Sequence, residues 1–176
     1  MNLPNKLTIA RVIAVPFFIG AYYLEWYLVA FVIFVAASFT DMLDGQIARK
    51  HNLVTNFGKI MDPLADKVLV YSALCLMIPI YVPAWMMIVI LAREFTVSGM
   101  RTVAAAEGIV IAAGMSGKIK TVLQMVAVCL LLLVPGFPGF LPLWYIAQGF
   151  LWASLIMTVY SGVEYVLQNK QVFSMK

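Results

Sequence analysis

Charge is what this sequence has least of. Only 11% of its 176 residues are Asp, Glu, Lys or Arg, whereas a soluble domain carries about a quarter. This shortage excludes an ordinary soluble domain, and the 64% hydrophobic content places the chain in the membrane class. The length suits a single domain covering residues 1–176, and the sequence shows no internal repeat or low-complexity tract. The net charge of +4 needs no nucleic-acid partner, because anionic lipid and an anionic substrate account for it.

Cysteine and histidine are also scarce. Cys75 and Cys129 each lie inside an apolar run, so we interpret them as small core residues without a disulfide framework or metal-ligand spacing. The single histidine, His51, is interpreted as a solvated loop residue. A cleaved signal peptide is not expected, because Arg11 lies inside the first apolar run and no small-residue cleavage site follows. The first segment is therefore predicted to remain as a membrane span.

Apolar segments long enough to cross a bilayer, which takes roughly 20 residues, occur six times. They are Leu7 to Leu24, Tyr27 to Ala48, Pro63 to Ile80, Pro83 to Ala104, Ile119 to Val134 and Leu143 to Leu167. Prolines and glycines interrupt the chain at 79–83 and at 135–139, where they predict sharp turns. The fold prediction is an all-α integral membrane protein with six transmembrane helices.

The positive charge is distributed unevenly over this topology. With six spans, both termini and the connections 49–62 and 104–118 share one side, and all 12 lysines and arginines lie on or nearer that side. The opposite side carries only Glu25, and tyrosines and tryptophans gather there. The positive-inside rule therefore predicts that both termini and the two long connections face the cytoplasm, in a multi-pass protein of the cell membrane. The fold prediction includes a polar active-site cavity that opens on the same side.

Four carboxylates form the main chemical pattern. Asp41 and Asp44 close the second span, and Asp62 and Asp66 open the third. Spacings of three and four residues place each pair on one helix face, and the short return between them lets the two faces meet. Converging carboxylates repel, so we predict that divalent cations neutralise them; oxygen ligands suit Mg²⁺, Mn²⁺ or Ca²⁺ rather than zinc. The alternative is four helix-end aspartates solvated at the membrane interface.

These residues resemble a known family signature at every fixed position. The sequence Asp41-x2-Asp44-Gly45-x2-Ala48-Arg49-x8-Gly58-x3-Asp62-x3-Asp66 is similar to the signature of the CDP-alcohol phosphotransferases. The opening from Asn2 to Thr8, followed by Arg11, and the segments 92–95 and 117–121 resemble the bacterial phosphatidylglycerophosphate synthases of that family. The resemblance implies transfer of the phosphatidyl group of CDP-diacylglycerol to glycerol 3-phosphate, with release of CMP, in phospholipid biosynthesis. It also implies a homodimer, and symmetric pairs are the commonest oligomers.

The resemblance further implies roles for individual residues. Asp41, Asp44, Asp62 and Asp66 would hold Mg²⁺ or Mn²⁺, most simply as two ions, and Asp66 would also act as general base toward the acceptor hydroxyl. The residues expected to bind the CDP-lipid are Asn5, Thr8, Gly45, Ala48, Arg49, Thr55 and Gly58. Small residues at 45 and 48 would let a diphosphate approach the backbone. For Asn5 and Thr8 the alternative is simple capping of the first helix.

The acceptor phosphate requires cations, and the fourth span supplies two. Arg93 and Arg101 lie within one broad face of that span, and an intramembrane arginine is a functional candidate whose fork matches phosphate. The full set of predicted acceptor-phosphate residues is Arg93, Arg101, Lys118, Lys120 and Lys59. The alternative is that Glu94, Glu107 or lipid headgroups merely balance these charges.

Three other functions stay open at this point. The same scaffold could use inositol phosphate, serine or phosphatidylglycerol as acceptor. Intramembrane carboxylates also mark ion pathways, but a cation transporter is disfavoured because the aspartates gather at one interface and no broken-helix pair recurs in both halves. A non-catalytic lipid-binding protein would leave the four carboxylates unexplained.

Overall fold

The structure, a computed structural model, describes residues 3–50, 56–109, 111–112 and 114–171, with the backbone alone at 3–6, 41–50, 56–60, 62–63 and 66. The described residues form α-helices and one short 3₁₀ turn, with no strand among them, which confirms the all-α prediction. The elements are α1 (Leu3–Tyr23), α2 (Tyr27–Lys50), α3 (Asn56–Leu76), α4 (Ala84–Ala106), α5 (Met115–Leu133), η1 (Val134–Gly136) and α6 (Leu141–Gln168).

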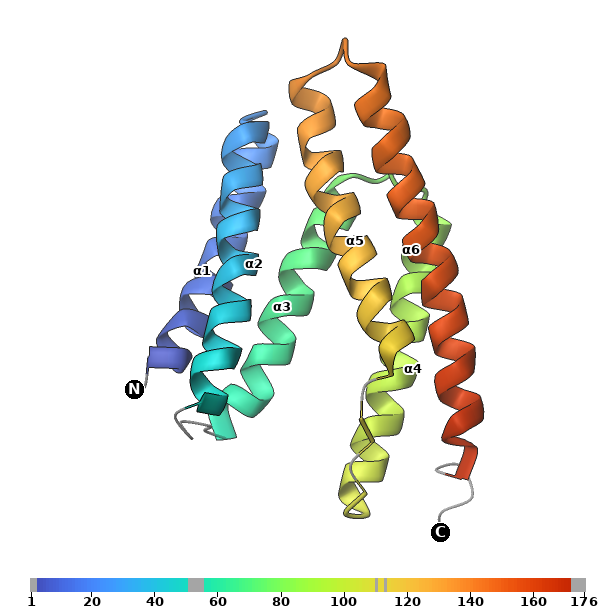
Figure 1. Cartoon of the computed structure of the whole chain (residues 1–176). Helices are drawn as coiled ribbons and strands as arrows, with labels where there is room; N and C mark the ends of the chain where they lie inside the picture. The colour runs from blue at the N-terminus through green and yellow to red at the C-terminus, as the bar shows by residue number, and fades with distance from the viewer. Residues whose placement is uncertain (1–2, 51–55, 110, 113, 172–176) are drawn as a thin grey trace.

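Successive helices alternate in direction, so the beginning of α1 and the end of α6 lie at the same end of the molecule (Figure 1). The α1–α2 hairpin packs against α3, and α5 packs against α6 and α2. α4 packs mainly against α6. One apolar core joins all six helices, and its fully buried members include Phe18, Phe34, Leu74, Met86, Leu131 and Leu151.

Two helical segments in the described part of the chain are long and apolar enough to cross a membrane, Met115–Gly136 and Leu141–Gln168. Shorter apolar stretches lie in α1, α2 and α3. α4 differs because it carries Arg93 and Glu94 at its middle and Arg101 in its second half. Large apolar side chains are nevertheless exposed on helices throughout the bundle, such as Val32 (62%), Ile88 (66%) and Ile156 (65%), as lipid-facing surfaces require.

Helix ends differ most from prediction around the predicted return at 49–62. α2 continues to Lys50, and α3 begins at Asn56 and runs through Pro63, so most of this return is helical. Hydropathy marks only the apolar part of a helix, whereas its backbone hydrogen bonds extend into the polar layer without cost. The two Pro/Gly interruptions were predicted correctly, because α3 ends at Leu76 before one and η1 follows α5 at the other.

The cysteine prediction was wrong in one respect. Cys75 is exposed on α3 instead of lying in the core, and Cys129 is only partly buried. Both thiols are free, as expected. An apolar sequence run does not distinguish a helix face that packs on protein from one that faces lipid, because both are apolar.

Candidate active site

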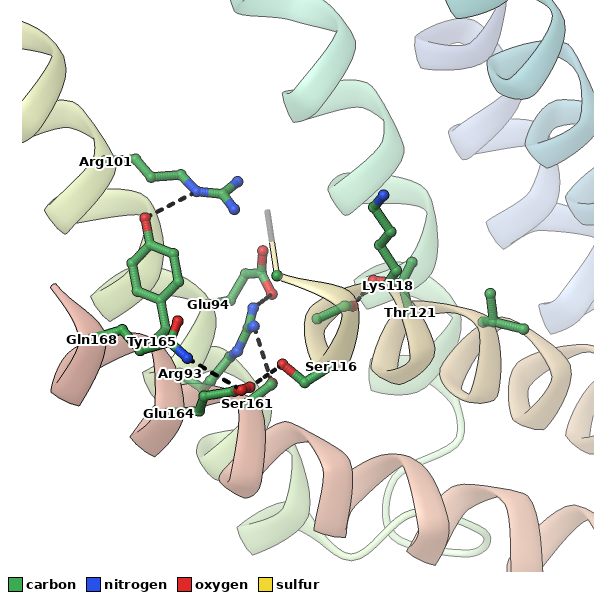
Figure 2. Close-up of a pocket in the computed structure, with 13 residues that line it drawn as sticks. Arg93, Glu94, Arg101, Ser116, Lys118, Thr121, Ser161, Glu164, Tyr165 and Gln168 are labelled. Carbon is green, nitrogen blue, oxygen red and sulfur yellow. Dashed lines mark hydrogen bonds and ion pairs between the residues drawn. The ribbon is translucent and has the colours of Figure 1, made fainter. Parts of the chain in front are cut away.

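A cavity of about 350 Å³ opens between the stretch of α4 from Arg93 to Arg101, the first turns of α5 and the last turns of α6. Its polar and charged lining residues are Arg93, Glu94, Arg101, Ser116, Lys118, Thr121, Ser161, Glu164, Tyr165 and Gln168 (Figure 2). We call it the cationic cavity after Arg93, Arg101 and Lys118. The parts of α4, α5 and α6 that line it lie toward the end of the molecule at which α2 ends and α3 begins (Figure 1).

Arg93 is the most enclosed cation of this cavity, with a side chain only 12% exposed. Its Nη2 donates a hydrogen bond to Ser161 Oγ at 3.0 Å, and its Nη1 lies 3.4 Å from Glu94 Oε2. Its Nε is buried and has no hydrogen-bond partner among the described residues. Groups from α4 and α6 therefore hold this guanidinium in place (Figure 2).

Arg101 and Lys118 are more open. Arg101 Nε donates to the Tyr165 hydroxyl at 3.2 Å, and its guanidinium carbon lies 5.4 Å from the centre of the same ring. Both cations are exposed, and neither forms an ion pair with a carboxylate among the side chains that the structure describes. Their charge is thus available to an anion that enters the cavity.

Glu94 is the centre of a group of three cations. Its Oε1 lies 3.2 Å from Lys67 Nζ, and its Oε2 lies 3.0 Å from Lys120 Nζ and 3.4 Å from Arg93 Nη1. Lys67, on α3, also donates to Ser98 Oγ at 2.9 Å. Because α4 and α3 are otherwise joined mainly through other helices, this carboxylate supplies a polar link between them.

Lys120 does not line the cationic cavity. Its side chain is 5% exposed and faces a smaller cavity of about 60 Å³, beside Lys67, Glu94 and Gln124. Burying a charge is costly unless a counter-ion accompanies it, and Glu94 is that counter-ion here. The alternative interpretation, in which Glu94 balances these cations, therefore describes the surroundings of Lys120 well.

The α6 wall of the cavity was missed in the sequence. The Ser116 hydroxyl donates to Glu164 Oε2, and Gln168 Nε2 donates to Glu164 Oε1 at 3.3 Å. Four polar residues of α6 recur at helical spacing and mark one face of an apolar helix: Ser161, Glu164, Tyr165 and Gln168. That periodicity was visible in the sequence and could have identified the wall.

The four aspartates lie inside helices and not at their ends, because α2 and α3 both extend beyond the predicted spans. Asp41 and Asp44 lie in the last turns of α2, and Asp62 and Asp66 in the first three turns of α3. These two helices contact each other, so the backbone brings both pairs to one end of the molecule (Figure 1). The aspartate side chains lie outside the described residues, and among the described side chains no group of three or more His, Cys, Asp or Glu forms a metal site.

A donor set of carboxylate oxygens alone fits a hard divalent cation. Lys67 directly follows Asp66, and its ammonium reaches Glu94. The aspartate-bearing helix α3 is therefore tied to the wall of the cationic cavity. The metal assignment itself stays a prediction.

The residues predicted to bind the CDP-lipid come from the ends of α1, α2 and α3. Thr8 is fully buried in α1. Only the helical backbone is described at Asn5, Gly45, Ala48, Arg49 and Gly58, and the same holds for the acceptor candidate Lys59. Thr55 lies outside the described residues.

Comparison with known proteins decides the family. The sequence profile of the CDP-alcohol phosphatidyltransferases matches residues 1–160. The chain belongs to this family. A CDP-diacylglycerol–glycerol-3-phosphate 3-phosphatidyltransferase of Bacillus subtilis is 46% identical over 96% of this chain and 95% of its own length. A protein of the same name from Rickettsia felis is 39% identical over 98% of this chain and 97% of its own length. A probable phosphatidylglycerophosphate synthase of Mycobacterium tuberculosis is 38% identical over 94% and 80%.

Membership in the family confirms the resemblance and makes the protein an enzyme, a membrane phosphatidyltransferase. The signature from Asp41 to Asp66 falls inside the matched range. The α6 wall of the cavity, Ser161 to Gln168, begins just beyond that range. Part of the wall of the cationic cavity thus lies outside the range that the family profile matches.

Proposed function

We propose that this phosphatidyltransferase transfers the phosphatidyl group of CDP-diacylglycerol to glycerol 3-phosphate, giving phosphatidylglycerophosphate and CMP. The observation that carries the proposal is the cationic cavity, which places Arg93, Arg101 and Lys118 around a space suited to a small polar anion. The names of the B. subtilis and R. felis relatives support the same acceptor.

In this proposal the acceptor phosphate binds between the exposed cations Arg101 and Lys118, with Arg93 at the inner wall. Arginine offers the bidentate fork that phosphate accepts, and Lys118 adds a point charge. The polar groups of Ser116, Ser161 and Gln168 complete the lining. Lys59 and Lys120 stay in the proposal as weaker contributors, since Lys120 already has Glu94 as its partner.

The chemistry is assigned to the aspartate helices. Asp66 takes the proton of the acceptor hydroxyl. The hydroxyl oxygen forms its bond to the lipid-bearing phosphorus as the bond from that phosphorus to the CMP oxygen breaks. The metal, Mg²⁺ or Mn²⁺ and most simply two ions, would be held by Asp41, Asp44, Asp62 and Asp66. When bound, such ions neutralise the diphosphate and the charge that develops on the transferred group.

The CDP-lipid is assigned to the neighbouring ends of α1, α2 and α3. Its proposed contacts are Asn5, Thr8, Gly45, Ala48, Arg49, Thr55 and Gly58. The ion pair between Lys67 of α3 and Glu94 of α4 would fix the CDP-lipid site relative to the acceptor site. The aspartate-bearing parts of α2 and α3 and the cavity-lining parts of α4, α5 and α6 lie toward the same end of the bundle (Figure 1), and this supports a meeting of both substrates near Asp66.

We also propose six membrane spans, with both termini and the active site on the cytoplasmic side, and a homodimer in the membrane. The alternating helices and the exposed apolar side chains support the span number. Cysteines introduced at Phe137 and Thr55, after replacement of Cys75 and Cys129, should label from opposite sides of intact cells. Labelling of both positions from outside would overturn this topology.

Radiolabelled glycerol 3-phosphate tests the reaction. Purified protein with CDP-diacylglycerol and Mg²⁺ should incorporate the label into lipid and release CMP in equal amounts. Inositol phosphate, serine and phosphatidylglycerol, offered in the same assay, should give much slower CMP release. Preference for any of these three would replace glycerol 3-phosphate as the proposed acceptor.

A further inference from the structure

Arg93 passes between two glycines on the neighbouring helices. A Cβ atom added at Gly162 of α6 would lie 2.8 Å from Arg93 Cγ, and one added at Gly117 of α5 would lie 3.3 Å from Arg93 Nη2. Favourable contacts between carbon atoms are about 3.5–4.0 Å. We call this passage the Arg93 slot, defined by Gly117 and Gly162.

The two walls of the slot constrain Arg93 differently. Nη2 is the far end of a flexible chain and can give way by a few tenths of an ångström. Cγ cannot, because its position follows from χ1, and a helix permits few χ1 rotamers. A side chain at position 162 would therefore force Arg93 into another rotamer or separate α4 from α6.

Either change would move the guanidinium. In the present arrangement Arg93 reaches Ser161 at 3.0 Å and Glu94 at 3.4 Å, and these two bonds orient it along the cavity wall (Figure 2). Ser161 directly precedes Gly162 on α6. One turn of that helix therefore supplies both the hydrogen-bond acceptor for the guanidinium and the space for the Cβ and Cγ atoms of Arg93.

We propose that Gly162 is a positioning residue that determines where Arg93 presents its guanidinium to the acceptor anion. The inference rests on the proposed function in one respect, that Arg93 binds the acceptor phosphate. Gly117 also limits where the guanidinium can lie, but less strictly, because its close contact is with the flexible end of Arg93. Selection of a small phosphorylated acceptor then depends on a residue that touches no substrate and lies beyond the matched family range.

Gly162→Ala tests the proposal, with Gly149→Ala as the matched control on the same helix. A Cβ at Gly149 meets no atom within 4 Å, so this variant should keep both wild-type KM values and gain some thermal stability. Gly162→Ala should raise the KM for glycerol 3-phosphate about tenfold and change the KM for CDP-diacylglycerol less than twofold. The KM of Gly117→Ala for glycerol 3-phosphate should lie between those of Gly149→Ala and Gly162→Ala. Equal acceptor KM values for Gly162→Ala and Gly149→Ala would overturn the inference.

An Arg93→Ala background separates positioning from helix packing. Alanine has no Cγ, so adding Gly162→Ala to it should change the acceptor KM and the thermal stability by no more than Gly149→Ala does in that background. If Gly162→Ala folds poorly alone, the double variant should recover the yield. If Gly162→Ala lowers the thermal stability as much in the Arg93→Ala background as in the wild type, Gly162 only packs α4 on α6, and the inference is overturned.

Calorimetric titration of glycerol 3-phosphate into the detergent-purified protein, without CDP-lipid, distinguishes the two proposals. Wild-type protein that binds this acceptor tenfold more tightly than Gly162→Ala supports the inference. Equal binding by both overturns it. If the wild type uses a different acceptor from the panel, the proposed function fails, and the same comparison with that acceptor still decides the role of Gly162.

Discussion

The acidic and the cationic ends of this active site are built in different ways. All four aspartates come from two consecutive helices, α2 and α3, within the segment from Asp41 to Asp66. The cationic cavity takes its residues from α4, α5 and α6, between Arg93 and Gln168. Local spacing thus specifies the acidic group, whereas long-range packing assembles the cationic one.

The acidic and cationic regions also differ in how their charges are balanced. The cationic cavity contains carboxylates of its own, since Glu94 holds Arg93 and Glu164 accepts from Ser116. The cation that follows the aspartates, Lys67, turns to Glu94 and Ser98. The cavity is therefore organised before its ligand arrives, whereas in our proposal cations supplied from solution neutralise the aspartates. This contrast leads to four predictions.

Metal removal should have the largest effect and should act on the acidic region alone. Exhaustive chelation with EDTA should abolish CMP release, and Mg²⁺ or Mn²⁺ should restore it. Asp41→Ala should raise the metal requirement or eliminate activity, because the variant lacks one of the four carboxylates proposed to bind the metal. Calorimetric binding of glycerol 3-phosphate should survive chelation. Full turnover in metal-free buffer would contradict the assignment.

Asp66→Asn should lower turnover by about 10²–10⁴-fold, the usual contribution of a general base, while part of the CDP-lipid binding survives. Glu107→Gln is the control, because this exposed carboxylate lies at the end of α4, outside the cationic cavity. The measurement compares the turnover rates of Asp66→Asn, Glu107→Gln and the wild type at saturating metal. An Asp66→Asn enzyme that keeps more than about a third of the wild-type rate would remove this residue from the mechanism.

Arg93→Ala or Arg101→Ala should raise the KM for glycerol 3-phosphate about 10- to 150-fold, the loss expected for one charge-assisted contact. The KM for CDP-diacylglycerol should change far less. Arg93→Lys should recover only part of the affinity, because an ammonium lacks the guanidinium fork. If the arginines only balance Glu94 and lipid phosphates, the folded yield falls and the acceptor KM of the surviving protein stays the same.

Glu94→Gln should have the smallest effect on rate and a clear effect on stability. It leaves the buried Lys120 without its counter-ion, and breaking a buried pair costs about 3–5 kcal/mol. Adding Lys120→Met removes the stranded charge and should recover most of the thermal stability. A raised acceptor KM in this double variant, beyond that of Glu94→Gln, would show that Lys120 binds the acceptor after all.

The predictions from sequence were most successful where the information is local. The spacing of Asp41, Asp44, Asp62 and Asp66 placed each pair on one helix, α2 and α3, because helical periodicity needs no tertiary information. Helix ends were less predictable: α3 begins at Asn56, before the apolar segment that was recognised. The polar face from Ser161 to Gln168 was missed because only one of its four residues, Glu164, is charged and the rest of α6 is mostly apolar.

The sequence by itself determined the membrane class, the helical segments, the asymmetry of the basic residues and the family signature, since each depends on residues close together in the chain. Packing alone decided which cations share a cavity. Lys118 and Lys120 are two residues apart on α5 and point about 200° apart around it. Their spacing predicts different faces, but only the contact of α5 with α6 and α4 directs Lys118 into the cationic cavity and Lys120 onto Glu94. Only tertiary contacts carry that information, because they join helices that lie far apart in sequence.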